Sequence, residues 1–304
     1  MAGAAVIVPF QDRYAEEVAA LYCLLVPSWI QTAESLRHRQ VSEPERARRR
    51  SWVALEGDDV VGYATALFDW WGAETGKGRL WVGVREDRRR RGIGSELWQT
   101  AVAHLRGANK LVLEVDGDPA GLRFAEKRGF VKYSSEIMSS LDPRECELRP
   151  KPHEGFRVQS LRAVRDRERE LFEFYGAAGG LRPADPENRV TLPDWRRFIL
   201  ENPLLDDDAS VVVEDAEGRI VSLAWLLVDD ARRRAENEWT ATVPPLRGRG
   251  LARLAKIASI RAAAGRGITQ IVTGNDPDNL PMRELNRRLG YQELYERLDL
   301  ERSG

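Results

Sequence analysis

Two short stretches rich in glycine and arginine stand where a strand-like run meets a helix-like run. The first reads Arg89-Arg90-Arg91-Gly92-Ile93-Gly94 and the second reads Arg247-Gly248-Arg249-Gly250-Leu251-Ala252. Small residues in such a turn leave backbone N–H groups unpaired at the positive end of a helix dipole. These amides and the flanking arginines would bind a phosphate group. The spacing differs from the dinucleotide fingerprint and the Walker loop, which place more residues between their key positions.

Each stretch is followed by a second matching element. One runs from Asp118 to Gly129 and the other from Asn279 to Gly290, and an aromatic residue follows the glycine in both. The spacing from the polar residue to the glycine is the same in the two elements. A repeat of this length predicts two copies of a whole domain rather than a solenoid of short units.

Hydrophobic periodicity and turn residues predict the elements that position these stretches. In the first copy we predict strands over 5–9, 51–55, 60–67, 79–84 and 111–115, and helices over 12–25, 95–105 and 121–128. In the second copy we predict strands over 156–161, 210–215, 219–228, 238–243 and 267–273, and helices over 166–175, 192–201, from 251 onward and over 283–289. The segment 143–154, with prolines among charges, is the expected linker between domains 1–142 and 155–304.

At these residues the chain resembles the GCN5-related N-acetyltransferase (GNAT) superfamily, whose acyl-CoA signature is [Arg/Gln]-x-x-Gly-x-[Gly/Ala] after the fourth strand. Both stretches satisfy it, from Arg89 to Gly94 and from Arg247 to Ala252. The second copy also resembles the C-terminal half of tandem enzymes of the mycothiol synthase type, through residues 240–244 and 273–282. The resemblance implies an α/β (α+β) fold of two tandem GNAT domains, each a mixed, mostly antiparallel sheet flanked by helices.

The resemblance further implies that acetyl-CoA is the cofactor, with its diphosphate on the loops and its pantetheine along the preceding strand. A backbone N–H near the end of that strand would polarise the thioester carbonyl, and we expect this oxyanion donor at Val243 or its neighbour Thr242. The implied cofactor-binding residues are Val82, Val84, Arg89, Arg90, Arg91, Gly92, Ile93, Gly94 and Ser95 in the first copy, and Thr242, Val243, Arg247, Gly248, Arg249, Gly250, Leu251, Ala252, Asn275, Asn279 and Asn286 in the second.

The implied reaction is direct attack of a primary amine on the thioester within a ternary complex. An amine with a pKa of about 10 is protonated at neutral pH, so a base must first remove its proton. Glu238 is the expected base and Glu236 the second choice; a surface carboxylate without a role is the alternative. Many members of the superfamily protonate the leaving thiolate with a tyrosine, but Ala125 and Asn286 occupy that position here. Water, the incoming ammonium or another residue such as Tyr291 would then supply the proton.

We expect acetyl transfer in the second copy, with a partly degenerate first copy that covers the acceptor cleft or holds a CoA that is not turned over. The reverse division is the alternative, because the first loop is also intact. Two other hypotheses are acylation in low-molecular-weight thiol biosynthesis, as in the mycothiol synthase type, and a non-catalytic acyl-CoA-binding sensor. The absence of the tyrosine from both copies favours the sensor. No motif identifies the acceptor, which we expect to be a small-molecule or peptide amine.

Length and composition limit the remaining classes of function. A chain of 304 residues suffices for two domains, each with its own core. Because 47 basic side chains balance 48 acidic ones, there is no general electrostatic reason to expect a nucleic-acid partner. The sequence has neither a run of ~20 apolar residues nor a secretion-signal pattern, so we expect a cytoplasmic protein without a membrane partner.

The cysteines, the histidines and the repeat lead to two further expectations. Two cysteines and three scattered histidines predict neither a disulfide framework nor a metal site. Single-domain members of the superfamily pair as dimers, and a tandem chain can make this pairing within one molecule. We therefore expect a monomer that is an internal pseudo-dimer, or a homodimer.

Overall fold

The computed structural model describes residues 5–72, 74–150, 153–181 and 189–304, which fold into two compact units. Of the described residues, unit 1 comprises 5–72, 74–135, 189–190 and 296–304, and unit 2 comprises 136–150, 153–181 and 191–295. Each unit is a mixed, mostly antiparallel sheet flanked by helices, which is the predicted fold class. The units are described separately below.

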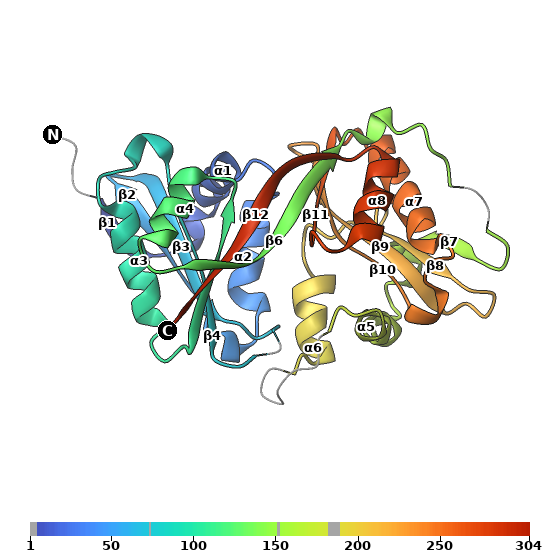
Figure 1. Cartoon of the computed structure of the whole chain (residues 1–304), viewed down its shortest axis with the longest axis horizontal. Coiled ribbons are helices and arrows are strands. Elements are labelled where there is room, and N and C mark those ends of the chain that lie inside the picture. The colour runs from blue at the N-terminus through green and yellow to red at the C-terminus, as the bar shows by residue number, and fades with distance from the viewer. Residues whose placement is uncertain (1–4, 73, 151–152, 182–188) are drawn as a thin grey trace. The chain divides into compact units, whose positions relative to one another are not determined.

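Unit 1 is built on six strands in the order β1-β2-β3-β4-β5-β12, and only β4 and β5 are parallel to each other (Figure 1). The strands are β1 (Val6–Pro9), β2 (Arg50–Glu56), β3 (Asp59–Phe68), β4 (Lys77–Val84), β5 (Lys110–Asp116) and β12 (Gln292–Ser303). The helices are α1 (Ala15–Leu25), α2 (Ala33–Ser42), α3 (Ile93–His104) and α4 (Pro119–Glu126).

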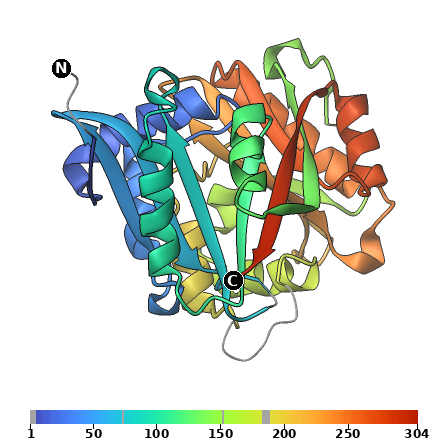
Figure 2. The same cartoon turned by 60° about the vertical axis from the view of Figure 1, so that its left-hand side comes forward.

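The helices of unit 1 cover the two faces of its sheet. Val18 of α1 and Leu36 of α2 pack with Tyr63 of β3 on one face. On the other face, Leu97 of α3 packs with Ala64, the next residue of the same strand, because alternate side chains of a strand point to opposite faces. Figure 2 shows α3 on this face, in front of the strands. The loop between β4 and α3 is therefore held at one edge of a packed layer.

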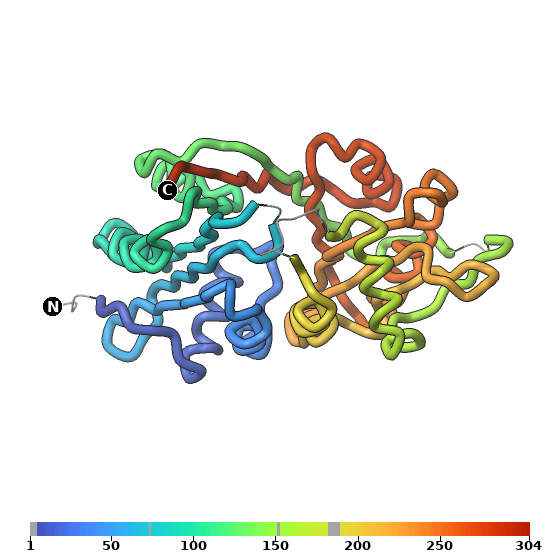
Figure 3. The backbone as a smooth tube through the Cα atoms, turned by 90° about the horizontal axis from the view of Figure 1, so that it is seen from below, coloured from blue at the N-terminus to red at the C-terminus, as the bar shows by residue number. Residues whose placement is uncertain are grey.

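Unit 2 repeats this plan with the strand order β6-β11-β10-β9-β8-β7. Its strands are β6 (Val131–Leu141, of which residues 136–141 belong to this unit), β7 (Arg157–Ser160), β8 (Val211–Glu214), β9 (Ile220–Asp229), β10 (Arg234–Thr242) and β11 (Gln270–Asn275). Its helices are α5 (Glu168–Ala177), α6 (Leu192–Trp195), α7 (Leu251–Gly265) and α8 (Leu280–Leu289), and a π-helical turn over Arg196–Leu200 continues α6. In Figure 3 this segment is the yellow coil. The helix predicted over 192–201 is thus α-helical only in its first turn.

Each unit takes its last strand from the other copy of the sequence repeat. Residues 137–141 of β6, which follow the first copy, pair with residues 271–275 of β11 in unit 2. Residues 297–303 of β12, which follow the second copy, pair with residues 110–116 of β5 in unit 1. The predicted domains, 1–142 and 155–304, follow the two copies of the sequence repeat. The compact units differ from these domains because the two strands are exchanged.

The exchange makes a testable prediction about Leu300, a residue of β12 that is 1% exposed and packs in the core of unit 1. Replacing a buried leucine by alanine removes apolar contacts and leaves a cavity, at a cost of about 2–5 kcal/mol. We expect Leu300→Ala to raise the rate of amide hydrogen exchange in β4 and β5 of unit 1.

Leu294→Ala is the matched control, because Leu294 lies on the same strand and is 46% exposed. Hydrogen exchange followed by mass spectrometry locates the effect. Faster exchange confined to α7 and β10 of unit 2 would contradict the assignment of Leu300 to the core of unit 1.

Candidate active site

In each unit, two neighbouring parallel strands pair only over three residues and then diverge. β4 pairs with β5 over residues 77–79 and 110–112, and β10 pairs with β11 over residues 234–236 and 270–272. The remainder of β4 and β10 therefore presents on this side backbone groups that have no partner in the neighbouring strand. Such an edge can bind an extended ligand in the way that a sheet binds an added strand.

The backbone amides that follow β4 and β10 form two anion cradles. Among the described residues, the N–H groups from Arg90 to Gly94 and from Gly248 to Ala252 donate no hydrogen bond. Helices α3 and α7 begin inside these segments, and neither helix has a side-chain N-cap. The uncapped amides and the helix dipole together favour an anion at each cradle. The cradles therefore fit the diphosphate of acetyl-CoA.

The conformation of each cradle depends on glycine. Gly92 and Gly250 precede their helices with left-handed φ angles of 90° and 81°. Glycine adopts this conformation without the steric cost that a Cβ brings. A Cβ built on Gly250 would meet no atom within 4 Å, so the space beside this residue is open.

The first arginine of each signature ties its loop to the preceding strand. Arg89 Nε donates to the carbonyl of Val84 over 3.2 Å, and Arg247 Nε donates to the carbonyl of Thr242 over 3.1 Å. The two copies thus repeat the same contact. These guanidinium groups hold the cradles in position and bring positive charge close to them.

A cavity of about 530 Å³ lies where β4 and β5 of unit 1 diverge. Its walls are the strand ends over 80–84 and 113–116, the loop that precedes α3, the first turn of α3 and residues of α4. All of these residues belong to unit 1. The cavity connects the free amides of the first cradle with the unpaired edge of β4, as the binding of CoA requires.

Most of the cofactor-binding residues predicted in the first copy meet at this cavity. Two do not line it: the Arg91 guanidinium lies 3.6 Å from the Glu56 carboxylate, and the Ile93 side chain is 4% exposed in the core. Those that line it are Val82, Val84, Arg89, Arg90, Gly92, Gly94 and Ser95.

In unit 2, several of the predicted side chains serve the fold. Leu251 is 1% exposed and lies in the core. The Arg249 guanidinium lies 5.2 Å from the centre of the Phe156 ring. Thr242 Oγ1 shares a hydrogen bond of 2.9 Å with the Ser222 hydroxyl. These residues can therefore contribute to cofactor binding through their backbone amides rather than through their side chains.

The three predicted asparagines have different environments. Asn279 caps α8, because its Oδ1 accepts a hydrogen bond from the Met282 amide over 3.3 Å. Asn286 Nδ2 donates to Asn275 Oδ1 over 2.6 Å. The Oδ1 atom of Asn286 is buried and has no hydrogen-bond partner among the described residues. A buried acceptor of this kind is normally satisfied by a ligand or by water.

The Val243 amide cannot act as the oxyanion donor in this structure. It donates to the carbonyl of Val221 in β9 over 3.0 Å, and the Arg85 amide makes the same bond to Val61 in unit 1. Consecutive amides of a strand point to opposite edges, so the N–H of Thr242 points away from β9 and towards the diverging side. The expectation at Val243 is therefore corrected in favour of its neighbour Thr242.

A β-bulge in unit 2 sets Glu238 apart from the rest of its strand. Asn237 pairs with Leu226 of β9 and Trp239 pairs with Trp225, so Glu238 has no partner residue in the register. Bulges redirect side chains and are frequent next to active sites. Residues 78–84 of β4 pair one to one with β3 and have no such irregularity.

Asn237 holds this bulge together. Its Nδ2 donates to the carbonyl of Trp225 over 2.8 Å, and its Oδ1 accepts from the Thr240 hydroxyl over 3.0 Å. Thr273 Oγ1 of β11 donates to the backbone carbonyl of Asn237 over 3.1 Å. Lys256 Nζ, from the inner side of α7, also donates to Asn237 Oδ1.

Lys256 and Asn237 were not predicted as site residues. Lys256 is 2% exposed, and burial lowers its pKa to about 7. The available signal was a lysine on the apolar face of an amphipathic helix, one turn after Ala252 and one turn before Ile260. The bulge gives no signal in the sequence, because it depends on the register between two strands.

The predicted catalytic residues Glu238 and Tyr291 differ in accessibility. Glu238 is exposed. Burial raises the pKa of the Tyr175 phenol, and the nearby Glu238 carboxylate raises it further. Tyr291 is 4% exposed, and burial raises the pKa of its phenol well above the ordinary value. A buried phenol with a raised pKa is a weak acid, so the geometry does not favour Tyr291 as the proton donor.

In the described part of the chain, no helix is long and apolar enough to cross a membrane. The same residues contain no group of three or more His, Cys, Asp or Glu side chains arranged to hold a metal ion.

Comparison with solved structures shows the fold. A tandem GNAT protein from the clavulanic acid biosynthesis pathway superposes with a TM-score of 0.76 at 19% identity, covering 98% of both chains. A GCN5-related N-acetyltransferase from Sphaerobacter thermophilus superposes with a TM-score of 0.71 at 16% identity, covering 98% of this chain and 95% of the other.

Comparison of sequences adds relatives and a family. A mycothiol acetyltransferase of Saccharomonospora viridis is 28% identical over 246 residues, which are 77% of this chain and 76% of the relative. A mycothiol acetyltransferase of a Nocardioides species is 25% identical over 84% of each chain. The model of the acetyltransferase (GNAT) family matches twice, over residues 14–130 and 167–291. With two family matches and two phosphate cradles in one chain, this protein belongs to the acetyltransferase (GNAT) family as a tandem member.

Proposed function

We propose that this N-acetyltransferase moves an acetyl group from acetyl-CoA to a primary amine and that the transfer takes place in unit 2. We choose unit 2 because of the β-bulge at Glu238. The bulge places a carboxylate just beyond the last residue of β10 that pairs with β11. Unit 1 lacks both the bulge and a carboxylate at this point of β4. Unit 1 would then bind cofactor without transferring it.

Residues of unit 2 account for the binding and activation steps. The amides from Gly248 to Ala252 would hold the diphosphate, and the free edge of β10 would hold the pantetheine. Acetyl-CoA supplies the acetyl group as a thioester. The Thr242 amide is the donor that we assign to the thioester carbonyl, in place of Val243.

Glu238 would act as the base that makes the acceptor amine a nucleophile. An ammonium with a pKa of about 10 must lose a proton before it can attack a carbonyl. The exposed Glu238 carboxylate can accept this proton directly or through one water molecule. Because the Tyr291 phenol is buried, we assign the proton that the leaving thiolate needs to water or to the incoming ammonium.

Glu238→Gln tests this role. The change keeps the shape of the side chain but removes the basic group, and we expect kcat to fall about 100-fold or more, the usual contribution of a general base. A thiol-release assay over a panel of primary amines measures the loss. Glu236→Gln on the same strand is the control, and we expect it to change kcat less than about threefold. An equal loss in both variants would contradict the assignment to Glu238.

A second candidate is transfer in unit 1, and the cavities of that unit favour it. The cavity of about 530 Å³ shares Trp81 and Glu114 with a smaller neighbouring cavity, so a cofactor and an acceptor could meet there. Glu114 would then be the carboxylate at the meeting point. Variants of the two cradles separate the candidates, as described in the Discussion.

Two narrower hypotheses concern the acceptor and the activity itself. The names of the relatives from Saccharomonospora viridis and Nocardioides favour an acceptor amine of mycothiol biosynthesis. The sensor hypothesis rests on Ala125 and Asn286, which stand where a catalytic tyrosine is expected. If acetyl-CoA binds but no amine of the panel releases CoA thiol, the sensor replaces the enzyme.

A further inference from the structure

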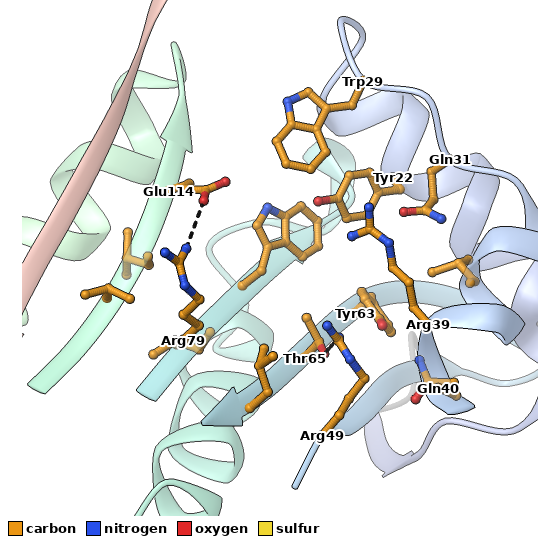
Figure 4. A pocket seen from close by; sticks show the side chains of 16 residues that line it. Tyr22, Trp29, Gln31, Arg39, Gln40, Arg49, Tyr63, Thr65, Arg79 and Glu114 are labelled. Atoms are coloured by element: carbon orange, nitrogen blue, oxygen red, sulfur yellow. Dashed lines mark hydrogen bonds and ion pairs between the residues drawn. The ribbon is translucent and has the colours of Figure 1, made fainter. Parts of the chain in front are cut away.

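The smaller cavity of unit 1 has a volume of about 160 Å³ and does not belong to the cradle. It is close in size to a cavity of about 150 Å³ that accepts a benzene ring. Aromatic rings and aliphatic side chains form much of its wall, and three arginines reach it (Figure 4). The apolar part of the wall includes the rings of Tyr22, Trp29, Tyr63 and Trp81, and aliphatic side chains such as Leu36 and Leu67.

Two of the three arginines are already paired with carboxylates. Arg49 donates two hydrogen bonds, of 2.9 and 2.5 Å, to Glu43. The negative charge of this carboxylate balances the positive charge of Arg49. Arg79 lies 3.1 Å from Asp69 and 3.3 Å from Glu114. One guanidinium is thus shared by two carboxylates, of which Glu114 lines the cavity.

The third arginine, Arg39, has no such partner. Within the part of the chain that the structure describes, its guanidinium makes no hydrogen bond and no ion pair. The neighbouring Tyr22 does not neutralise it, because burial raises the pKa of that phenol far above its ordinary value and keeps it uncharged. In Figure 4 the Arg39 guanidinium points towards Tyr22. This side of the cavity therefore offers a cation.

We propose that this cavity binds a zwitterionic amino carboxylate with an apolar side chain, whose carboxylate lies at Arg39 and whose ammonium lies at Glu114. Arg39 and Glu114 stand on opposite sides of the cavity (Figure 4). A guanidinium donates to a carboxylate, and a carboxylate that already holds one guanidinium can accept further hydrogen bonds. The apolar wall would hold the side chain.

The ammonium end would lie closest to the cofactor cavity. Glu114 and Trp81 line both cavities, whereas Arg39 lines only the smaller one. The site lies in unit 1 and goes beyond the transfer proposed for unit 2, so binding there does not depend on Glu238. If transfer takes place in unit 1, the same site would be its acceptor site.

Three ligands of nearly equal shape test the charge assignment. L-phenylalanine has both charges, L-phenylalaninamide lacks the carboxylate, and 3-phenylpropanoate lacks the ammonium. Calorimetry on the full chain without acetyl-CoA should show one bound L-phenylalanine and about tenfold or more weaker binding of each of the other two, because each loses one charged hydrogen-bonding group.

Variants of the two charged side chains locate the ligand. Arg39→Gln should weaken L-phenylalanine about tenfold or more and leave the affinity for the amide unchanged. Glu114→Gln should weaken L-phenylalanine and leave 3-phenylpropanoate unchanged. Arg37→Gln is the control, since Arg37 lies on the same helix but pairs with Glu16 outside the cavity. If Arg39→Gln binds L-phenylalaninamide as well as the wild-type chain does, the variant is folded.

Three results would overturn the proposal. One is equal affinity of the wild-type chain for all three ligands. Another is the same loss of L-phenylalanine binding in Arg37→Gln as in Arg39→Gln. The third is the absence of saturable L-phenylalanine binding up to about 10 mM. These experiments measure binding and not turnover. Their results therefore hold even if the acetyl transfer proposed for unit 2 is wrong.

Discussion

Gly250→Asp should remove acetyl-CoA from the second cradle and lower turnover about 100-fold or more, whereas Gly92→Asp should empty the first cradle and leave turnover nearly unchanged. Each substitution places a carboxylate among amides that would hold a diphosphate, so like charges repel where an anion should bind. The space beside Gly250 is open, and the nearest atom to a Cβ on Gly92 is a Glu96 oxygen 4.0 Å away, so the new side chain has room. Calorimetry gives the number of bound acetyl-CoA molecules, and thiol release gives turnover.

Gly250→Asn and Gly92→Asn are the matched controls for this experiment. Asparagine has nearly the same shape as aspartate and tolerates the left-handed conformation, but it carries no charge. Both controls should therefore retain much more cofactor binding than the aspartate variants. If Gly92→Asp alone abolishes turnover, transfer takes place in unit 1 and the role proposed for Glu238 is wrong.

Lys256→Met should remove a pH dependence from the stability of unit 2. Burial lowers the pKa of Lys256 to about 7, whereas a lysine in the unfolded chain has a pKa of about 10.4. Between these values the unfolded chain binds a proton that the folded chain does not, so this group makes stability rise with pH by up to about 1.4 kcal/mol per pH unit. Below pH about 7 both states are protonated and the folded state carries the full cost of the buried charge.

Urea unfolding at pH 7, 8 and 9 measures this effect as the difference between the wild-type chain and Lys256→Met. As the pH rises, the free energy of unfolding of the wild-type chain should increase steadily relative to that of Lys256→Met. Lys127→Met, at an exposed lysine, is the control and should give a constant difference. Parallel stability curves for the wild-type chain and Lys256→Met would show that the Lys256 pKa is not lowered in the folded state.

The repeat and the cradles could be predicted from the sequence because short-range rules determine them. Gly92 and Gly250 stand at the point where a strand gives way to a helix, and the structure gives both a left-handed conformation. The strands on either side of each cradle follow from local hydrophobic runs. In contrast, α2 has mixed polar and apolar residues with weak periodicity, and no helix was predicted there.

Long-range pairing explains most of what could not be predicted. Residues 131–141 and 292–303 have strand-like stretches, but nothing in them indicates which unit they complete. The bulge at Glu238 depends on the register of β10 against β9. Arg49 and Arg79 pair with carboxylates and Arg39 has no ion pair among the described residues, a difference that depends on the tertiary structure and that a single sequence does not give.

The site residues show the same division between local and distant causes. Asn279 was expected to bind the cofactor, and its position before a helix suits the cap that it forms instead. Tyr291 is buried in a core cluster with residues as distant in the chain as Cys146, so its suitability as an acid could not be judged from its neighbours in the sequence. Whether Val243 or Thr242 offers a free amide depends on the strand across from it.

The exchanged strands also constrain the order in which the protein can fold during synthesis. Residues 297–303 leave the ribosome after all of unit 2, yet they pair with β5 and fill the core of unit 1. Strand β5 therefore has no β12 to pair with until the whole second half of the chain has been translated. A nascent chain halted before residue 297 would expose that strand edge to chaperones or to another nascent copy.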